Sequence, residues 1–430
     1  MRALPLRLAL ALFACALPVT PASAQQPGFP GNAVGVFLDC HTWYCDFDHF
    51  RREITWVNWM RDRQDADIHV LVTQQETGGG GSALTLAFIG LRQYAGREDT
   101  LEYISDADDT EAEVRDGLTQ TLKLGLVPFV SASPVGQRLG ISYEAPPDAA
   151  LAGPSATRDP WNYWVFELGI GGEMELESQQ RFWEGEGSIR ANRTTEAFKI
   201  TLRGSYSGSR EEFDFTDEDT GADTTVVSTR TFLETDALAT WSLTDHWSVG
   251  AMAEFDRISV INYDAAIQVG PAVEYNIYPW AESTRRQLTI LYAIGVGIYE
   301  YARETIFLKT SEAHPIHQLE VSTEIRQPWG EVDASLEWFQ YLHDVDLHRI
   351  ELDAGVSIRI VRGLGFELYG SVARIRDQIY LPLEEATPEE VLTQQLARGT
   401  EFRTELHVGL SYRFGSKFNN VVNPRMGGGF

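Results

Sequence analysis

One group of side chains has the residue types of a hydrolytic site. His343 is followed by Asp344 and Asp346, so an imidazole and two carboxylates lie within four residues. A hydrolase needs a nucleophile or an activated water beside a base that a third group orients. The chain has neither a Gly-x-Ser-x-Gly nor a His-Glu-x-x-His motif. Two interpretations therefore stay open, a catalytic rim site and, favoured, a solvated acidic loop.

A second acidic group could bind a metal ion. Asp217, Asp219 and Asp223 flank Gly221, and Ca²⁺ prefers six to eight oxygen ligands. No glutamate that could bind in a bidentate manner follows at the usual distance. A solvated loop is favoured over a calcium site, and we expect no cofactor.

The first residues indicate export. Arg2 and Arg7 precede the apolar run 8–17, and Ala22-Ser23-Ala24 gives a small-residue cleavage site. Residues 1–24 are therefore predicted to be a signal peptide. Cys40 and Cys45 remain after its removal, and an oxidising compartment favours a local disulfide between them.

The charge of the chain argues against two kinds of partner. Lys and Arg total 35 against 62 Asp and Glu, which gives a formal net charge of -27. Such acidity argues against binding nucleic acid or docking on anionic lipid through charge.

Residues 25–143 are predicted to form a small α/β domain. Asp46 is expected to cap one helix. Thr110 and Glu113 form the pattern of a capping box that opens a second helix, which Gly125 is expected to end. His69 lies on a predicted strand and is expected to have a structural role. Residues 144–160 are rich in Pro, Ala, Gly and Ser, as in a linker.

Residues 161–414 contain about twelve segments in which apolar and polar residues alternate. Side chains of a strand point alternately to opposite faces, so each segment predicts a strand with one apolar face. Short turns alternate with longer polar loops. The predicted fold is a closed, twelve-stranded antiparallel transmembrane β-barrel behind a small periplasmic α/β domain, with a tail at 415–430. A soluble β-sandwich is the alternative.

The alternation also predicts which charges face the barrel interior. An arginine or lysine facing lipid near the midplane costs about 2–4 kcal/mol. The interior would then be either filled by salt bridges or a narrow, cation-favouring pore. The residues expected to face inward include Glu234, Asp236, Glu254, Glu320, Glu324, Asp333, Glu337, Arg349, Glu351, Asp353, Arg359, Arg403 and Glu405.

The end of the last segment resembles the assembly signal of outer-membrane barrels. Gly409, Tyr412 and Phe414 give a glycine followed by two aromatic residues two positions apart. The overall pattern resembles the salt-induced outer-membrane protein family. The resemblance implies an outer-membrane location, with lipid and the barrel assembly machinery as partners. The expected function is a non-enzymatic narrow channel or envelope-structural protein, whose periplasmic domain binds a protein or peptidoglycan. The alternative is an outer-membrane hydrolase.

Overall fold

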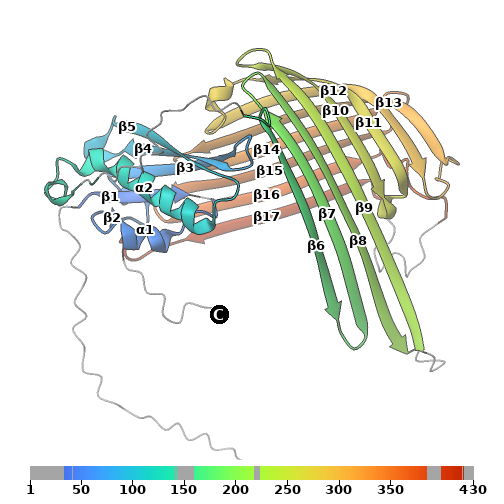
Figure 1. Ribbon diagram of the computed structural model, residues 1–430, viewed down its shortest axis with the longest axis horizontal. Coiled ribbons are helices and arrows are strands. Elements are labelled where there is room, and N and C mark those ends of the chain that lie inside the picture. Colours follow the sequence, from blue (N-terminus) through green and yellow to red (C-terminus); the bar gives the residue numbers. More distant parts are fainter. Residues whose placement is uncertain are drawn as a thin grey trace, which may run out of the picture.

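The computed structural model describes residues 33–40, 42–140, 142, 159–216, 223–384, 399–418 and 420. They form a five-stranded sheet with two helices and a twelve-stranded antiparallel sheet (Figure 1). The predicted mainly-β class, with twelve strands and a small α/β unit, is confirmed. No helix in the described part of the chain is long and apolar enough to cross a membrane. The predicted signal peptide and most of the predicted linker lie outside the described residues.

The N-terminal domain is a mixed sheet in the order β2-β1-β3-β4-β5. β1 pairs in parallel with β2 and β3, whereas β3, β4 and β5 pair in antiparallel fashion. Parallel strands need a crossover connection, and α1 lies in the one between β1 and β2. The elements are β1 (Gly35–Cys40), α1 (Phe47–Glu53), β2 (Asn58–Trp59), β3 (Ile68–Glu76), β4 (Ser82–Gly90), β5 (Glu98–Ser105) and α2 (Glu111–Val130).

The start of α2 agrees with the sequence, but its end does not. Glu113 N donates to Thr110 Oγ1 at 3.3 Å, and Thr110 N donates to Glu113 Oε2 at 2.9 Å, which confirms the capping box. The expectation that Gly125 ends the helix is wrong, because α2 continues to Val130. A Cβ added to Gly125 would lie 2.0 Å from Phe88 Cζ. The glycine therefore serves the close approach of helix and sheet rather than a C-cap.

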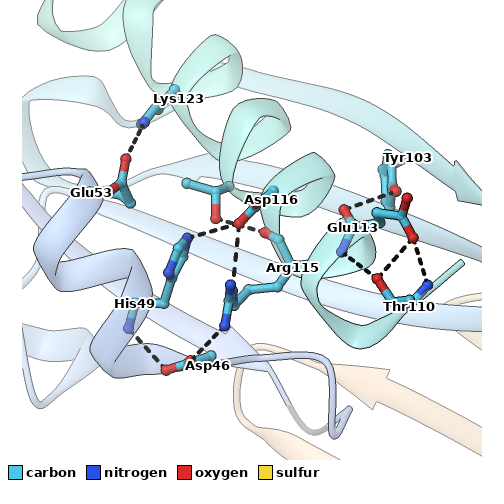
Figure 2. Close-up of polar contacts among 10 residues, drawn as sticks. Asp46, His49, Glu53, Tyr103, Thr110, Glu113, Arg115, Asp116 and Lys123 are labelled. Atoms are coloured by element: carbon cyan, nitrogen blue, oxygen red, sulfur yellow. Dashed lines mark hydrogen bonds and ion pairs between the residues drawn. The ribbon is translucent and has the colours of Figure 1, made fainter.

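Polar contacts join α1 to α2 at the surface of this domain (Figure 2). Lys123 Nζ lies 3.0 Å from Glu53 Oε2, and His49 Nε2 lies 3.2 Å from Asp116 Oδ1. These pairs are partly exposed, so each contributes little to stability. Burial of the apolar faces contributes most of the stability of this domain. The fully buried side chains of this core include Phe50, Ile54, Phe88, Leu118, Leu122 and Leu126.

The strand β3 is buried on both faces. Ile68, Val70 and Val72 belong to the core under the helices. Leu71 and Thr73 lie on the opposite face. They line a space shared with residues 280–285, which connect two strands of the large sheet. Helices therefore cover one face of the N-terminal sheet, and one end of the large sheet covers the other.

Each strand of the large sheet pairs with its neighbour in sequence, in the order β17 to β6. This topology needs only hairpin connections, which suit antiparallel strands. The strands are β6 (Trp164–Leu176), β7 (Gln180–Thr194), β8 (Phe198–Thr216), β9 (Asp223–Ser242), β10 (Trp247–Ile258), β11 (Tyr263–Asn276), β12 (Arg286–Tyr301), β13 (Ser311–Gln327), β14 (Gly330–Tyr341), β15 (His348–Val361), β16 (Leu364–Ile375) and β17 (Phe402–Tyr412).

The two end strands of this sheet are not paired with each other in the described residues. The strand order stops at β6 on one side and β17 on the other, and the two strands diverge in Figure 1. The sheet is curved, and both of its edges are free among the residues that the structure describes, whereas the sequence predicts closure. Closure requires strand number, tilt and stagger to agree around the whole ring, and alternation within single strands specifies none of these.

The short turns lie at one end of the large sheet, beside the N-terminal domain. Gly363 N donates to Asp62 Oδ2 at 2.6 Å, and Gln75 Nε2 donates to Ser283 Oγ at 3.0 Å. The segment after β17 also contacts the domain, because Phe418 forms an antiparallel bridge with Met60 beside β2. The N-terminal domain therefore contacts several hairpins and the tail at the same time.

Candidate functional site

The most strongly connected polar residues lie where the N-terminal domain meets the large sheet. Asp39 of β1 is buried, and both of its carboxylate oxygens accept from Arg359 of β15, at 2.7 and 2.5 Å. His69 Nε2 lies 3.0 Å from Asp39 Oδ2. Arg359 also donates to Pro328 O at 3.2 Å, and its guanidinium lies over the ring of Phe37. One buried carboxylate thus joins the two bodies through a planar, two-point contact.

The neighbours of His69 determine which of its ring nitrogens carries the hydrogen. Arg63 Nε donates to His69 Nδ1 at 3.1 Å, so Nε2 carries the hydrogen that is donated to Asp39. Burial lowers the pKa of His69. The Asp39 carboxylate opposes that shift, and the nearby Arg63 and Arg359 add to it. A neutral imidazole in a fixed tautomer follows. This arrangement suits a structural connector, as expected for His69.

A cavity of about 550 Å³ adjoins this contact. The N-terminal domain supplies one wall, from β1, α1 and residues 59–64, and the short-turn ends of β15, β16 and β17 supply the other. Its size falls in the range of pockets for small organic ligands. The charged side chains of the lining are Arg51, Arg61, Arg63, Arg359, Arg413, Asp39, Asp62 and Glu367, and the aromatic ones are Phe37, Phe47, Phe50, Trp59, Trp329 and Phe366.

The structure joins Cys40 and Cys45 in a disulfide. Cys40 ends β1 and directly follows Asp39, while Cys45 precedes α1. The bond restrains the chain that leaves β1. It thereby limits the movement of the Asp39 backbone.

The ladder register places the charged residues expected to face inward on one face of the large sheet, here called the inner face. Glu320 is opposite Glu337, which is opposite Glu351, and Glu254 is opposite Asp236. Residues that face each other across an antiparallel pair point to the same side. The same register relates Glu234, Glu324, Asp333, Arg349, Asp353, Arg359, Arg403 and Glu405.

The inner face is filled at the end away from the N-terminal domain. Tyr299 is fully buried there, with Tyr263, Tyr341 and Tyr380 around it. Tyr380 belongs to the connection after β16, which turns inward. Backbone and side-chain hydrogen bonds fix this connection: Asn262 Nδ2 donates to Tyr380 O at 2.9 Å, and Ile306 N donates to Leu381 O at 2.9 Å. Sequence patterning gave no sign of this cluster, because tyrosines also occur singly at membrane interfaces and on rims.

The proposed hydrolytic residues do not form a base and its orienting partner. The His343 ring stacks on His314, with ring centroids 3.6 Å apart. Asp344 Oδ1 accepts instead from the backbone of Asp346, at 2.9 Å. Burial lowers the pKa of His343, and the neighbouring His314 adds to that shift. The geometry matches a structured rim loop.

The other predicted sites are located as follows. Asp217 and Asp219 lie outside the described residues, as does the side chain of Asp223, with which β9 begins. The described residues contain no group of three or more His, Cys, Asp or Glu side chains suited to a metal ion. Gly409 and Tyr412 belong to β17, and the Phe414 ring stacks on Tyr412 with centroids 5.6 Å apart.

No protein-family model matches the chain, and no curated protein matches it. The resemblance to the salt-induced outer-membrane proteins therefore receives no support. Among solved structures, the chain is similar to the translocator domain of the autotransporter NalP from Neisseria meningitidis. That match has 11% identity and a TM-score of 0.25, and covers 58% of this chain and 87% of the other. A likeness at this TM-score carries no argument, so the fold rests on the strand pairing above.

Proposed function

We propose that the chain is a non-enzymatic outer-membrane β-barrel protein with an envelope-structural role, or a narrow passage that is closed at rest. The observation that carries this proposal is the apolar face of the large sheet opposite to the inner face, here called the outer face. Alternate residues of β12 expose Ile290, Tyr292, Ile294, Val296 and Ile298, each between 38% and 44%. A monomeric soluble protein rarely exposes so continuous an apolar surface.

Neighbouring strands extend this surface. Leu336 and Trp338 of β14 and Leu352 of β15 are exposed on the outer face. Trp241, Trp247 and Trp329 are exposed at the short-turn end. Indole rings favour the membrane–water interface, since one part is apolar and another donates a hydrogen bond. This distribution supports a hydrocarbon band bounded by an aromatic girdle.

A membrane position also requires the two free edges to be satisfied. Unpaired backbone groups in hydrocarbon cost several kcal/mol each, so a lipid-embedded sheet must close. The proposal therefore includes pairing of β6 with β17 in the bilayer. Gly409, Tyr412 and Phe414 would then be the signal through which the barrel assembly machinery inserts the chain.

The N-terminal domain would lie in the periplasm, on the side of the short turns. Its contacts with several hairpins support the role of a cap over that end, while the tyrosine cluster obstructs the other. Both features favour a structural protein over an open pore. Binding of a periplasmic protein or peptidoglycan by this domain is part of the proposal.

A matched pair of variants tests the lipid-facing surface. Leu352→Arg places a guanidinium on the outer face, and Asp353→Arg places one on the inner face one residue away, where it replaces a carboxylate. In lipid vesicles we expect Leu352→Arg to lower the free energy of unfolding by about 2–4 kcal/mol. Asp353→Arg should lower it by much less. Equal effects, or a wild-type protein that is freely soluble without detergent, would refute the proposal.

Conductance separates the two versions of the function. Folded wild-type protein in planar bilayers should give no steady conductance if the role is structural. Stepwise conductance that favours cations would instead identify a channel. The absence of a heat-dependent shift on a denaturing gel of the outer-membrane fraction would contradict the barrel itself.

A further inference from the structure

The cavity between the N-terminal domain and the large sheet has a charge opposite to that of the whole chain. Five arginines line it, Arg51, Arg61, Arg63, Arg359 and Arg413, against three acidic residues, Asp39, Asp62 and Glu367. The chain as a whole carries -27. Like charges that face each other across an interface are unfavourable unless a counter-charge lies between them.

Three of these arginines have no carboxylate within ion-pair distance among the described residues. Arg51 pairs with Asp48, and Arg359 with Asp39. For Arg61, Arg63 and Arg413 the described part of the chain provides no such partner, and Arg63 donates only to the neutral ring of His69. Asp62, between Arg61 and Arg63, accepts from two backbone amides, at Gln64 and Gly363.

Arg61 provides a second observation. Its Nε is buried, and in the described residues it has no hydrogen-bond partner. A buried polar atom without a partner is uncommon and costs free energy, above all on a charged group. A ligand oxygen would satisfy it.

We propose that this cavity binds a small organic oxyanion, a phosphate ester on a ring or apolar body. The guanidinium groups supply planar donors that fit phosphate oxygens in pairs. The aromatic side chains, among them Trp59, Trp329 and Phe366, supply surface for the rest of the molecule. Arg61 and Arg63 belong to the N-terminal domain and Arg413 follows β17, so the bound anion bridges the two bodies. The site is internal to the chain and does not depend on the membrane position proposed above.

Isothermal titration of the full mature protein in a nonionic detergent tests this site. The probes are inorganic phosphate, glucose 6-phosphate, short-chain phosphatidylglycerol and, as the uncharged comparison, glucose. We expect glucose 6-phosphate to bind, phosphate to bind more weakly, and glucose not to bind. Tighter binding of phosphatidylglycerol would identify a lipid headgroup as the source of the same chemistry. If none of the three anions binds, the inference is wrong.

Two variants locate the binding. Arg413→Gln changes an exposed side chain and should leave the fold intact, and Arg61→Gln removes the unpartnered guanidinium. Each should weaken the binding of glucose 6-phosphate by about tenfold or more, as expected for a lost charged hydrogen bond. The exposed Arg138→Gln, outside the cavity, is the control and should change nothing. Affinity that is unchanged in both cavity variants would place the anion elsewhere and overturn the assignment.

Discussion

Arg359 and Asp39 lie 320 residues apart in the sequence, yet their side chains form two parallel hydrogen bonds. The carboxylate is buried and already contacts His69, so the arginine supplies its neutralising charge from the other body of the protein. This contact makes the position of the N-terminal domain depend on β15. It also connects the candidate cavity to His69, whose side chain is fully buried.

Arg359→Met should loosen the N-terminal domain. This change removes both guanidinium hydrogen bonds from the buried Asp39 carboxylate. We expect the free energy of unfolding to fall by about 2–3 kcal/mol, a moderate value because Arg359 is partly exposed. Hydrogen exchange of residues 35–40 should accelerate. Asp48→Asn breaks a more exposed pair and should cost under about 0.5 kcal/mol. Unchanged exchange in Arg359→Met would mean that other contacts suffice for docking.

His69 should make stability depend on pH. Its pKa is lowered in the folded state, so the unfolded chain, with a histidine pKa of about 6.5, binds more protons. The contribution of His69 is complete above that value and is lost as pH falls toward the folded pKa. Denaturant titrations at pH 7 and pH 5 should show a smaller loss for His69→Gln than for wild type. His407→Gln, on β17, is the control, and an identical loss in all three proteins would refute the assignment.

Tyr299→Ala should disrupt the inner-face cluster. Tyr299 is fully buried, and truncation of a buried aromatic side chain costs about 3–5 kcal/mol. Hydrogen exchange at residues 379–381 should rise, since these residues pack on the tyrosine. Tyr369→Ala, at a position 46% exposed, should cost far less. If the cluster is what obstructs the inner face, conductance should appear only in Tyr299→Ala.

The seam between the end strands should close in lipid. A cysteine at Phe166 of β6, combined in turn with cysteines at Leu406, Val408 and Leu410 of β17, should yield at least one oxidative cross-link in vesicles. Phe166→Cys with Val372→Cys, on β16, is the control one strand further away. A scan in which no β17 position cross-links would show that the edges stay apart.

The sequence by itself determined the local structure. Thr110 and Glu113 specified the start of α2, and alternation specified twelve strands, because both depend on residues a few positions apart. It also specified which charges share a face, since register follows from hairpin pairing. Even so, the role of Gly125 was misjudged, because only its distance from Phe88 reveals why a glycine stands there.

Only the tertiary structure decided how the two bodies meet. The sequence shows an aspartate at 39 and a histidine at 69, but no residue near them indicates that Arg359 binds Asp39. The cavity, the tyrosine cluster and the unpaired edges of β6 and β17 likewise depend on contacts between distant segments. Such contacts form when whole elements pack together in three dimensions. Composition and periodicity reflect only the local structure within each element.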